Sequence, residues 1–210
     1  MMSVDPLILN AWLSARSIAR GLAPPLPEYG GFRIDTNSDV EVSRWIFPKL
    51  GPGLKELVRS IDDPRYFVKL CGEAGELRSA LPDFWTLHAP CYFMRANGVH
   101  PKRPLAQGYE IDIRRVGSAV EVRVFSDTGL LAASGYGAET EDVFVYDRIA
   151  TDPAHRRKGL GNAVMTALQG AKASPTVPEL LVATEDGRAL YTTLGWKTIS
   201  PYSTASIPVP

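Results

Sequence analysis

The second half of the chain has the hydrophobic pattern of strands interrupted by two helices. Alternating or continuous short apolar runs predict strands over 109–115, 120–124, 130–136, 143–151, 180–184 and 196–199. Apolar residues at steps of four and three after Leu160 predict a helix, and a shorter helix is expected over 187–194. A strand, a helix and a further strand in this order predict a parallel pair within a mostly antiparallel sheet.

The first hundred residues favour helices over strands. Asp5 and Pro6 are typical of a helix start, and apolar residues at helical spacing extend this helix to residue 20. Ser38 and Glu41 have the spacing of a capping box, which predicts a second helix up to residue 47. The other expected elements are a strand over 31–35, helices over 52–61 and 63–71, a helical turn over 76–81 and an extended segment over 84–94.

A boundary is expected between these two patterns. Asn97-Gly98 and the prolines at 101 and 104 are typical of a loop. We therefore predict an α+β fold with a helical N-terminal region over 1–104 and a strand-rich region over 105–210.

Composition argues against several classes of protein. The chain has 210 residues with 23 Lys and Arg against 23 Asp and Glu, so no overall positive charge attracts nucleic acid. Its two cysteines are expected to be reduced, and its three histidines lack the spacing of metal ligands, so we expect no metal. Neither a signal peptide nor a membrane-spanning apolar run is recognisable, which predicts a cytoplasmic protein with no membrane partner.

The stretch DPAHRRKGLG at 152–161 suggests an anion site. It follows an expected strand, opens an expected helix, and contains three consecutive cations and two glycines. The first N–H groups of a helix have no partner inside it, and the helix dipole makes that end positive. Glycines let an anion approach and arginines add donors, which favours phosphate or pyrophosphate. The alternative is a solvated basic turn. The glycine spacing fits neither a P-loop nor a Rossmann dinucleotide site.

Two motifs resemble those of the GNAT superfamily of acyl-CoA N-acyltransferases. Arg156-x-x-Gly159-x-Gly161 is similar to the family's [Arg/Gln]-x-x-Gly-x-[Gly/Ala] motif, and it has the same context of strand and helix. The sequence LYTTLGW at 190–196 is similar to the family's Leu-Tyr-x-x-x-Gly-[Phe/Trp] signature. The resemblance covers 109–196. It implies the GNAT fold, a central mixed, mostly antiparallel sheet flanked by helices, with the acyl-CoA-binding core over 105–210. Region 1–104 is then either part of that fold or a degenerate second copy, on the acceptor side.

The resemblance implies acetyl-CoA as a co-substrate. The backbone of the basic loop would hold the pyrophosphate, and the end of the preceding strand would hold the pantetheine arm through strand-like hydrogen bonds. The residues implied in binding are Ile149, Ala150, Thr151, Arg156, Arg157, Lys158, Gly159, Leu160 and Gly161. Core packing by Ile149 and Ala150 is compatible with this role, because the backbone does the binding.

Two residues are implied in proton transfer. Tyr191 occupies the family's usual general-acid position, and a phenol has a suitable pKa to protonate a thiolate. The alternative is a core tyrosine. Asp147 lies two positions before Ile149, so it is expected on the same side of the strand, where burial would raise its pKa and make it a better base. The alternative for Asp147 is a structural ion pair.

The hypothesis from the sequence is an acetyl-CoA-dependent N-acetyltransferase acting on a small amine or amino acid by direct attack in a ternary complex. One alternative is a non-catalytic acyl-CoA-binding sensor or partner protein on the same scaffold. Another is a protein N-acetyltransferase, although no acidic run suggests a peptide groove. The first helix and the C-terminal tail also allow a homodimer.

Overall fold

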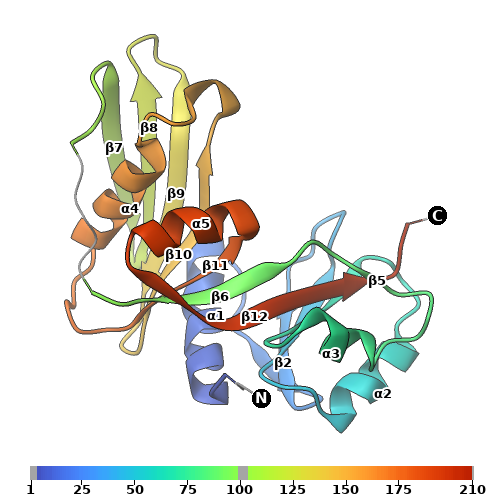
Figure 1. Ribbon diagram of the computed structural model, residues 1–210. Coiled ribbons are helices and arrows are strands. Elements are labelled where there is room, and N and C mark those ends of the chain that lie inside the picture. Colours follow the sequence, from blue (N-terminus) through green and yellow to red (C-terminus); the bar gives the residue numbers. More distant parts are fainter. Residues whose placement is uncertain (1–3, 99–103, 210) are drawn as a thin grey trace.

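The computed structural model describes residues 4–98 and 104–209 (Figure 1), so residues 99–103 of the expected boundary loop lie outside the described part. Its elements are α1 (Pro6–Arg20), β1 (Leu26–Glu28), β2 (Gly31–Asp35), β3 (Ser43–Phe47), α2 (Pro52–Ser60), β4 (Tyr66–Leu70), α3 (Ala74–Arg78), β5 (Thr86–Leu87), β6 (Cys91–Ala96), β7 (Tyr109–Val116), β8 (Ala119–Ser126), β9 (Leu131–Glu139), β10 (Phe144–Thr151), a 3-10 helix (Pro153–His155), α4 (Leu160–Gly170), β11 (Glu179–Thr184), α5 (Glu185–Thr193) and β12 (Trp196–Ser206). The strands form one sheet in the order β1-β2-β3-β4-β12-β6-β11-β10-β9-β8-β7, and β5 pairs with β12.

The strand predictions for the second half are confirmed. β7, β8, β9 and β10 form an antiparallel meander, and β10 pairs in parallel with β11. The helix between them, α4, begins at the expected Leu160 and buries Val164 and Leu168 against the sheet. β12 runs further than the pattern indicated, to Ser206, because it crosses into the other part of the sheet.

Two helices predicted in the first half are wrong. The segment over 38–47 contains the strand β3, and the segment over 63–71 contains β4. Ser38 does bond Glu41, through its Oγ and the Glu41 N–H at 3.1 Å, but this bond closes a turn before β3. All residues of β3 are buried, so its sequence has no alternation to distinguish it from a buried helix.

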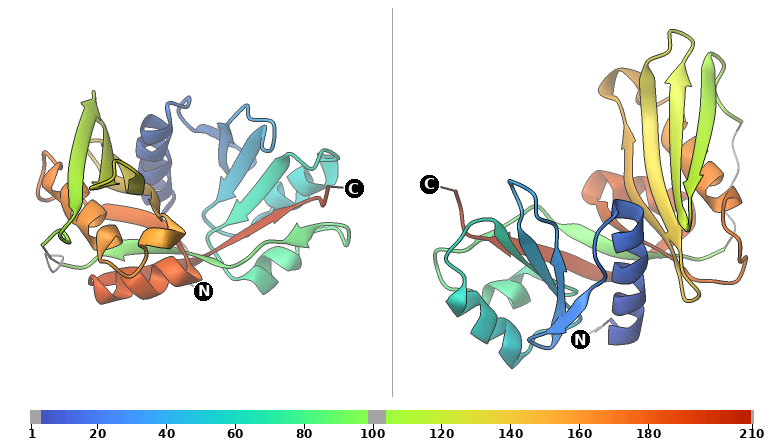
Figure 2. Two further views of the ribbon diagram at one scale, coloured as in Figure 1. Left: turned by 90° about the horizontal axis from the view of Figure 1, so that it is seen from above. Right: turned by 180° about the vertical axis from the view of Figure 1, so that it is seen from behind.

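The two parts of the sheet contain the same order of elements. β3, α2, β4 and α3 follow one another as β10, α4, β11 and α5 do, and each strand pair is parallel. The parts exchange strands, because β6 lies between β11 and β12, while β12 continues onto β4. Figure 2 shows both halves meeting at these two long crossing strands.

Helix α1 lies against the face opposite to the other helices (Figures 1 and 2). α4 and α5 share one hydrophobic cluster, and α2 and α3 pack over Trp45 and Phe47 in another. The α1 side chains Leu9 and Trp12 pack with residues of both halves, including Ile46 and Val145. α1 therefore joins the two halves on that face.

Candidate active site

Strands β10 and β11 separate soon after they meet. They pair only at Phe144 with Glu179 and at Val145 with Leu180. Beyond this point β11 pairs with β6, and β10 remains paired with β9 on its other side. The edge of β10 that faces β11 therefore carries unpaired backbone groups up to Thr151. Ala150 is exposed although it belongs to an interior strand of the sheet.

A bulge at Arg148 sets the direction of the side chains at this opening. Arg148 has φ of 52°, and the register with β9 shifts between Asp147 and Ala150. Asp147 bonds the arginines of α1, whereas Ile149 packs in the cluster beneath α4. The expectation that Asp147 and Ile149 share a face is therefore wrong, because the bulge breaks the two-residue period of the strand.

The basic loop forms the end of the opening. Asp152 caps the 3-10 helix by accepting a hydrogen bond from the Ala154 N–H at 2.9 Å. Arg157 and Gly159 have φ of 61° and 77°, and α4 then begins without a side-chain cap. Its first backbone N–H groups thus have no side-chain cap, and groups of this kind can bind an anion.

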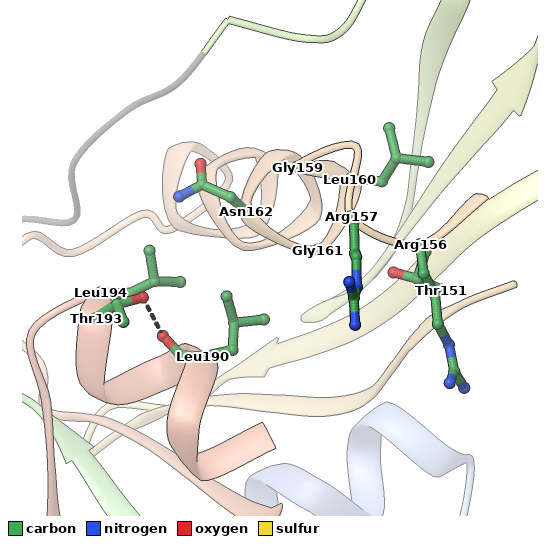
Figure 3. A pocket seen from close by; sticks show the side chains of 10 residues that line it. All are labelled: Thr151, Arg156, Arg157, Gly159, Leu160, Gly161, Asn162, Leu190, Thr193 and Leu194. Atoms are coloured by element: carbon green, nitrogen blue, oxygen red, sulfur yellow. Dashed lines mark hydrogen bonds between the residues drawn. The ribbon is translucent and has the colours of Figure 1, made fainter. Parts of the chain in front are cut away.

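A cavity of about 260 Å³ lies between the N-terminus of α4 and the side of α5 (Figure 3). Its lining residues are Thr151, Arg156, Arg157, Gly159, Leu160, Gly161, Asn162, Leu190, Thr193 and Leu194. A Cβ at Gly161 would lie 3.3 Å from Cδ2 of Leu190, so a side chain there would narrow the space. The structure thus brings six of the implied cofactor-binding residues to one cavity.

Lys158 lies apart from this cavity. Its Nζ donates to the hydroxyl of Tyr109 at 2.9 Å, and that hydroxyl is 2.8 Å from Nδ1 of His155. These contacts tie the loop to the start of β7. Sequence reasoning missed Tyr109 and His155, because the contact joins residues far apart in the chain. It also missed Asn162, Thr193 and Leu194, because the sequence predicts the helices there but not which side of each helix lines the cavity.

Tyr191 is buried next to the cavity. Its ring centroid is 6.1 Å from that of Trp196, and 7% of its surface is exposed. Burial raises the pKa of Tyr191 to about 12, so the phenol stays protonated at neutral pH. Its neighbours Leu190 and Leu194 line the cavity, and Tyr191 packs in the core cluster directly beside them.

Asp147 forms an ion-pair network with α1 and its own strand. Oδ1 accepts from Nε of Arg16 at 3.1 Å, and both oxygens accept from Arg20, at 2.6 and 2.9 Å. Nε of Arg148 is 3.2 Å from Oδ2. Burial by itself raises the pKa of Asp147, but the charges and hydrogen bonds of Arg16 and Arg20 outweigh it and lower the pKa to about 2. The expected rise of the pKa is therefore wrong, and these contacts favour the ion pair over a general base.

Within residues 4–98 and 104–209, no three His, Cys, Asp or Glu side chains are grouped so that they could hold a metal. In the same residues, no helix has both the length and the apolar character needed to cross a bilayer.

Comparison with known proteins relates this architecture to a family. Residues 119–198 match the family model of the acetyltransferase (GNAT) domain. No curated protein matches the chain by sequence. Residues 119–198 contain the opening between β10 and β11, the basic loop, the cavity and Tyr191.

Solved structures resemble the whole chain. A GCN5-related N-acetyltransferase from Kribbella flavida is 14% identical with a TM-score of 0.67, and the match covers 100% of this chain and 98% of that one. A putative GNAT-family acetyltransferase from Novosphingobium aromaticivorans is 16% identical with a TM-score of 0.63, over 98% and 100% of the two chains. A tandem GNAT protein from the clavulanic acid biosynthesis pathway is 16% identical with a TM-score of 0.51, over 80% and 76%. Residues 119–198 therefore resemble a GNAT acetyltransferase domain, and the whole chain has a fold that these solved GNAT structures share.

Proposed function

We propose that this protein is an N-acetyltransferase that uses acetyl-CoA and a small amine or amino acid. The observation that carries the proposal is the opening between β10 and β11, which ends at an uncapped helix start flanked by two exposed arginines. This combination offers unpaired strand groups for an amide-containing chain and cationic donors for a pyrophosphate.

Acetyl-CoA fits the residues present. The N–H groups at the start of α4 would bind the pyrophosphate, and Arg156 and Arg157 would neutralise its charge. The backbone from Ile149 to Thr151 would bind the pantetheine arm as an added strand, since β11 leaves that edge open. Lys158 would support the loop through Tyr109 instead of reaching the ligand.

Acetyl-CoA supplies an activated acetyl thioester. The backbone N–H groups beside the bulge are the donors available to stabilise negative charge on its carbonyl oxygen. Tyr191 would hold a proton at its hydroxyl for the leaving thiolate, and the raised pKa keeps that proton in place at neutral pH. The amine would enter from the α1 side of the sheet, opposite to the basic loop.

The N-terminal half supports a structural proposal as well. We propose that it is a degenerate second copy of the GNAT fold, because its elements follow the same order around a parallel strand pair. The likeness to a tandem GNAT structure agrees with this interpretation.

The first experiment is calorimetric titration of the purified protein with acetyl-CoA and free CoA, followed by an assay of thiol release with a panel of amines. We expect binding at micromolar to millimolar ligand and amine-dependent release of CoA. Absence of acetyl-CoA binding at millimolar concentration would contradict the proposal. Binding without turnover for any amine would favour an acyl-CoA sensor.

A further inference from the structure

A group of basic side chains lies on the α1 face of the sheet, between the two halves. We call it the basic cluster; it comprises Arg16 and Arg20 on α1, Arg44 on β3, Lys69 on β4 and Arg148 on β10. Arg44 lies two residues before Ile46 on β3, and Lys69 is the partner of Ile46 on β4. Both side chains are therefore on the same face of the sheet as Ile46. The carboxylates that pair with the cluster are Asp147 and Glu41. Two acids thus face five basic groups.

Both carboxylates already pair with arginines of the basic cluster, and other N–H groups of the cluster have no acceptor among the described residues. Asp147 receives Nε of Arg16, and Glu41 lies 2.9 Å from Nε of Arg44. Within the described residues, the terminal guanidinium nitrogens of Arg16 and Arg44 make no hydrogen bond, and Lys69 has no ion pair. Within the described residues, the hydroxyl of Tyr202 also has no hydrogen-bond partner, although the residue is only 3% exposed. Of these groups, the Tyr202 hydroxyl is fully buried, and an unpaired buried hydroxyl is costly, which indicates that a partner is missing.

The arginines surround a small cavity. Arg16, Arg20 and Arg44 line it together with Leu13 and Ile34. Its volume of about 10 Å³ has room for about one water molecule. Burial and the neighbouring charge of Arg16 lower the pKa of Arg44 to about 10, while burial and the charges of Arg44 and Arg16 lower that of Lys69 to about 7. The positive charges repel one another here, and an anion would relieve that repulsion.

The basic cluster adjoins the proposed reaction site from the acceptor side. Asp147, which holds Arg16 and Arg20, is next to the bulge at Arg148, and the proposed pantetheine-binding edge follows directly. The basic loop lies with α4 and α5 on the other face (Figures 1 and 3). A molecule anchored at Arg16 and Arg44 would therefore approach the opening from the side that acetyl-CoA leaves free.

We propose that the acceptor carries a carboxylate beside its amine, and that Arg16 and Arg44, assisted by Lys69 and the Tyr202 hydroxyl, bind this carboxylate. The inference rests on the proposed function and specifies its substrate class as an amino acid. Planar guanidinium groups match the two oxygens of a carboxylate, and the arginine that holds Asp147 would at the same time orient the substrate. The side chains of Arg16 and Arg44 are 16% and 6% exposed and their cavity holds about one water molecule, so binding a carboxylate requires Arg16 to shift outward and widen it.

A binding test needs no acetyl-CoA. Each standard amino acid, at about 10 mM, is compared with its α-amide for its effect on the thermal midpoint of the wild type, Arg44→Gln and Lys69→Gln. We expect at least one amino acid to raise the wild-type midpoint by about 3 °C and its amide to have no effect. The shift should be lost in Arg44→Gln and reduced in Lys69→Gln. Arg33→Gln is the matched control, since Arg33 pairs with Glu28 and Asp35 outside the cluster.

Kinetics then separate this inference from the proposed function. We expect kcat/KM for the best amino acid to exceed that of its amide by about 100-fold, and Arg44→Gln to reduce this ratio at least tenfold without changing the KM for acetyl-CoA. Equal rates with acids and amides would leave the acetyltransferase in place and overturn the carboxylate site. A midpoint shift with amino acids but no binding of acetyl-CoA would overturn the function and keep the site. A response to phosphoethanolamine alone, measured against ethanolamine, would overturn the carboxylate in favour of a phosphate.

Discussion

The two halves of the sheet show how one order of elements forms an opening in one place and a closed sheet in another. β3 and β4 pair along their whole length, from Ser43 with Tyr66 to Phe47 with Leu70. β10 and β11 pair at two positions and separate after Val145, before β10 reaches the bulge at Arg148. A parallel strand pair followed by a helix thus leaves an open strand edge only where the pairing stops.

The two helix starts differ in the same way. At α4, Gly159 and the exposed arginines leave the backbone N–H groups accessible. At α2, the start is covered by the turn after β1, and a Cβ on Gly53 would overlap the carbonyl of Tyr29. Helix α2 also has Pro52 at its first position, which has no N–H to donate. The N-terminal half therefore has the same order of elements, but the start of its helix α2 is covered.

The largest expected effect concerns Tyr191, the proposed proton donor of the C-terminal half. Tyr191→Phe removes only the hydroxyl, so we expect kcat to fall about 10³-fold while the dissociation constant of acetyl-CoA stays within about twofold. Steady-state kinetics and calorimetry on the same preparation check both values. Tyr66→Phe, at a partly buried tyrosine of the N-terminal half, should leave kcat unchanged. An unchanged kcat in Tyr191→Phe would support a sensor or another donor.

Charge reversal compares the cations that precede α4 with two cations along α2. In the double variant Arg156→Glu with Arg157→Glu, we expect acetyl-CoA to bind about 100-fold more weakly, because two charge-assisted contacts become repulsive. The matching variant on α2, Lys55→Glu with Arg59→Glu, changes the same charge beside a shallow depression and should not alter binding. Equal losses in both variants would indicate a general electrostatic effect instead of a site.

The smallest effect tests the contact of α1 with the C-terminal half. The pKa of Asp147 is about 2 when folded, below its ordinary value of 3.8, so its ion pairs stabilise the fold above pH 4. That contribution, about 2 kcal/mol, should disappear as the pH falls towards 2. We expect Asp147→Asn to lower the free energy of unfolding by about that amount at pH 7, measured with urea, and by progressively less in acid.

Asp35→Asn provides the comparison in the N-terminal half. Asp35 is 34% exposed and pairs with Arg33, so the loss at pH 7 should be smaller than for Asp147. Equal losses at both positions would show that the network around α1 contributes no more than a surface ion pair.

Local patterns predicted most of the fold and part of the site. Capping residues and apolar spacing predict helices α1, α2, α4 and α5, and alternation predicts strands β7 to β9. The cavity at Arg156, Arg157 and Gly161 follows from a contiguous motif, because a loop that opens a helix carries its donors with it. The strand β3 escaped prediction, since a strand buried on both faces has no period of its own, and β4 escaped because Asp63-Pro64 is typical of a helix start.

The amino-acid sequence by itself thus determined most of the local elements and the basic loop, and Tyr191 was singled out by the resemblance of its motif. Tertiary structure decided which elements pair and pack together and on which face each side chain lies. The bulge at Arg148 placed Asp147 and Ile149 on opposite faces of the sheet, and the exchange of β6 and β12 joined the halves. The basic cluster exists only because α1, β3, β4 and β10 meet on one face. Hydrophobic spacing and capping act within a few residues, whereas strand pairing and charge clusters join residues more than a hundred positions apart.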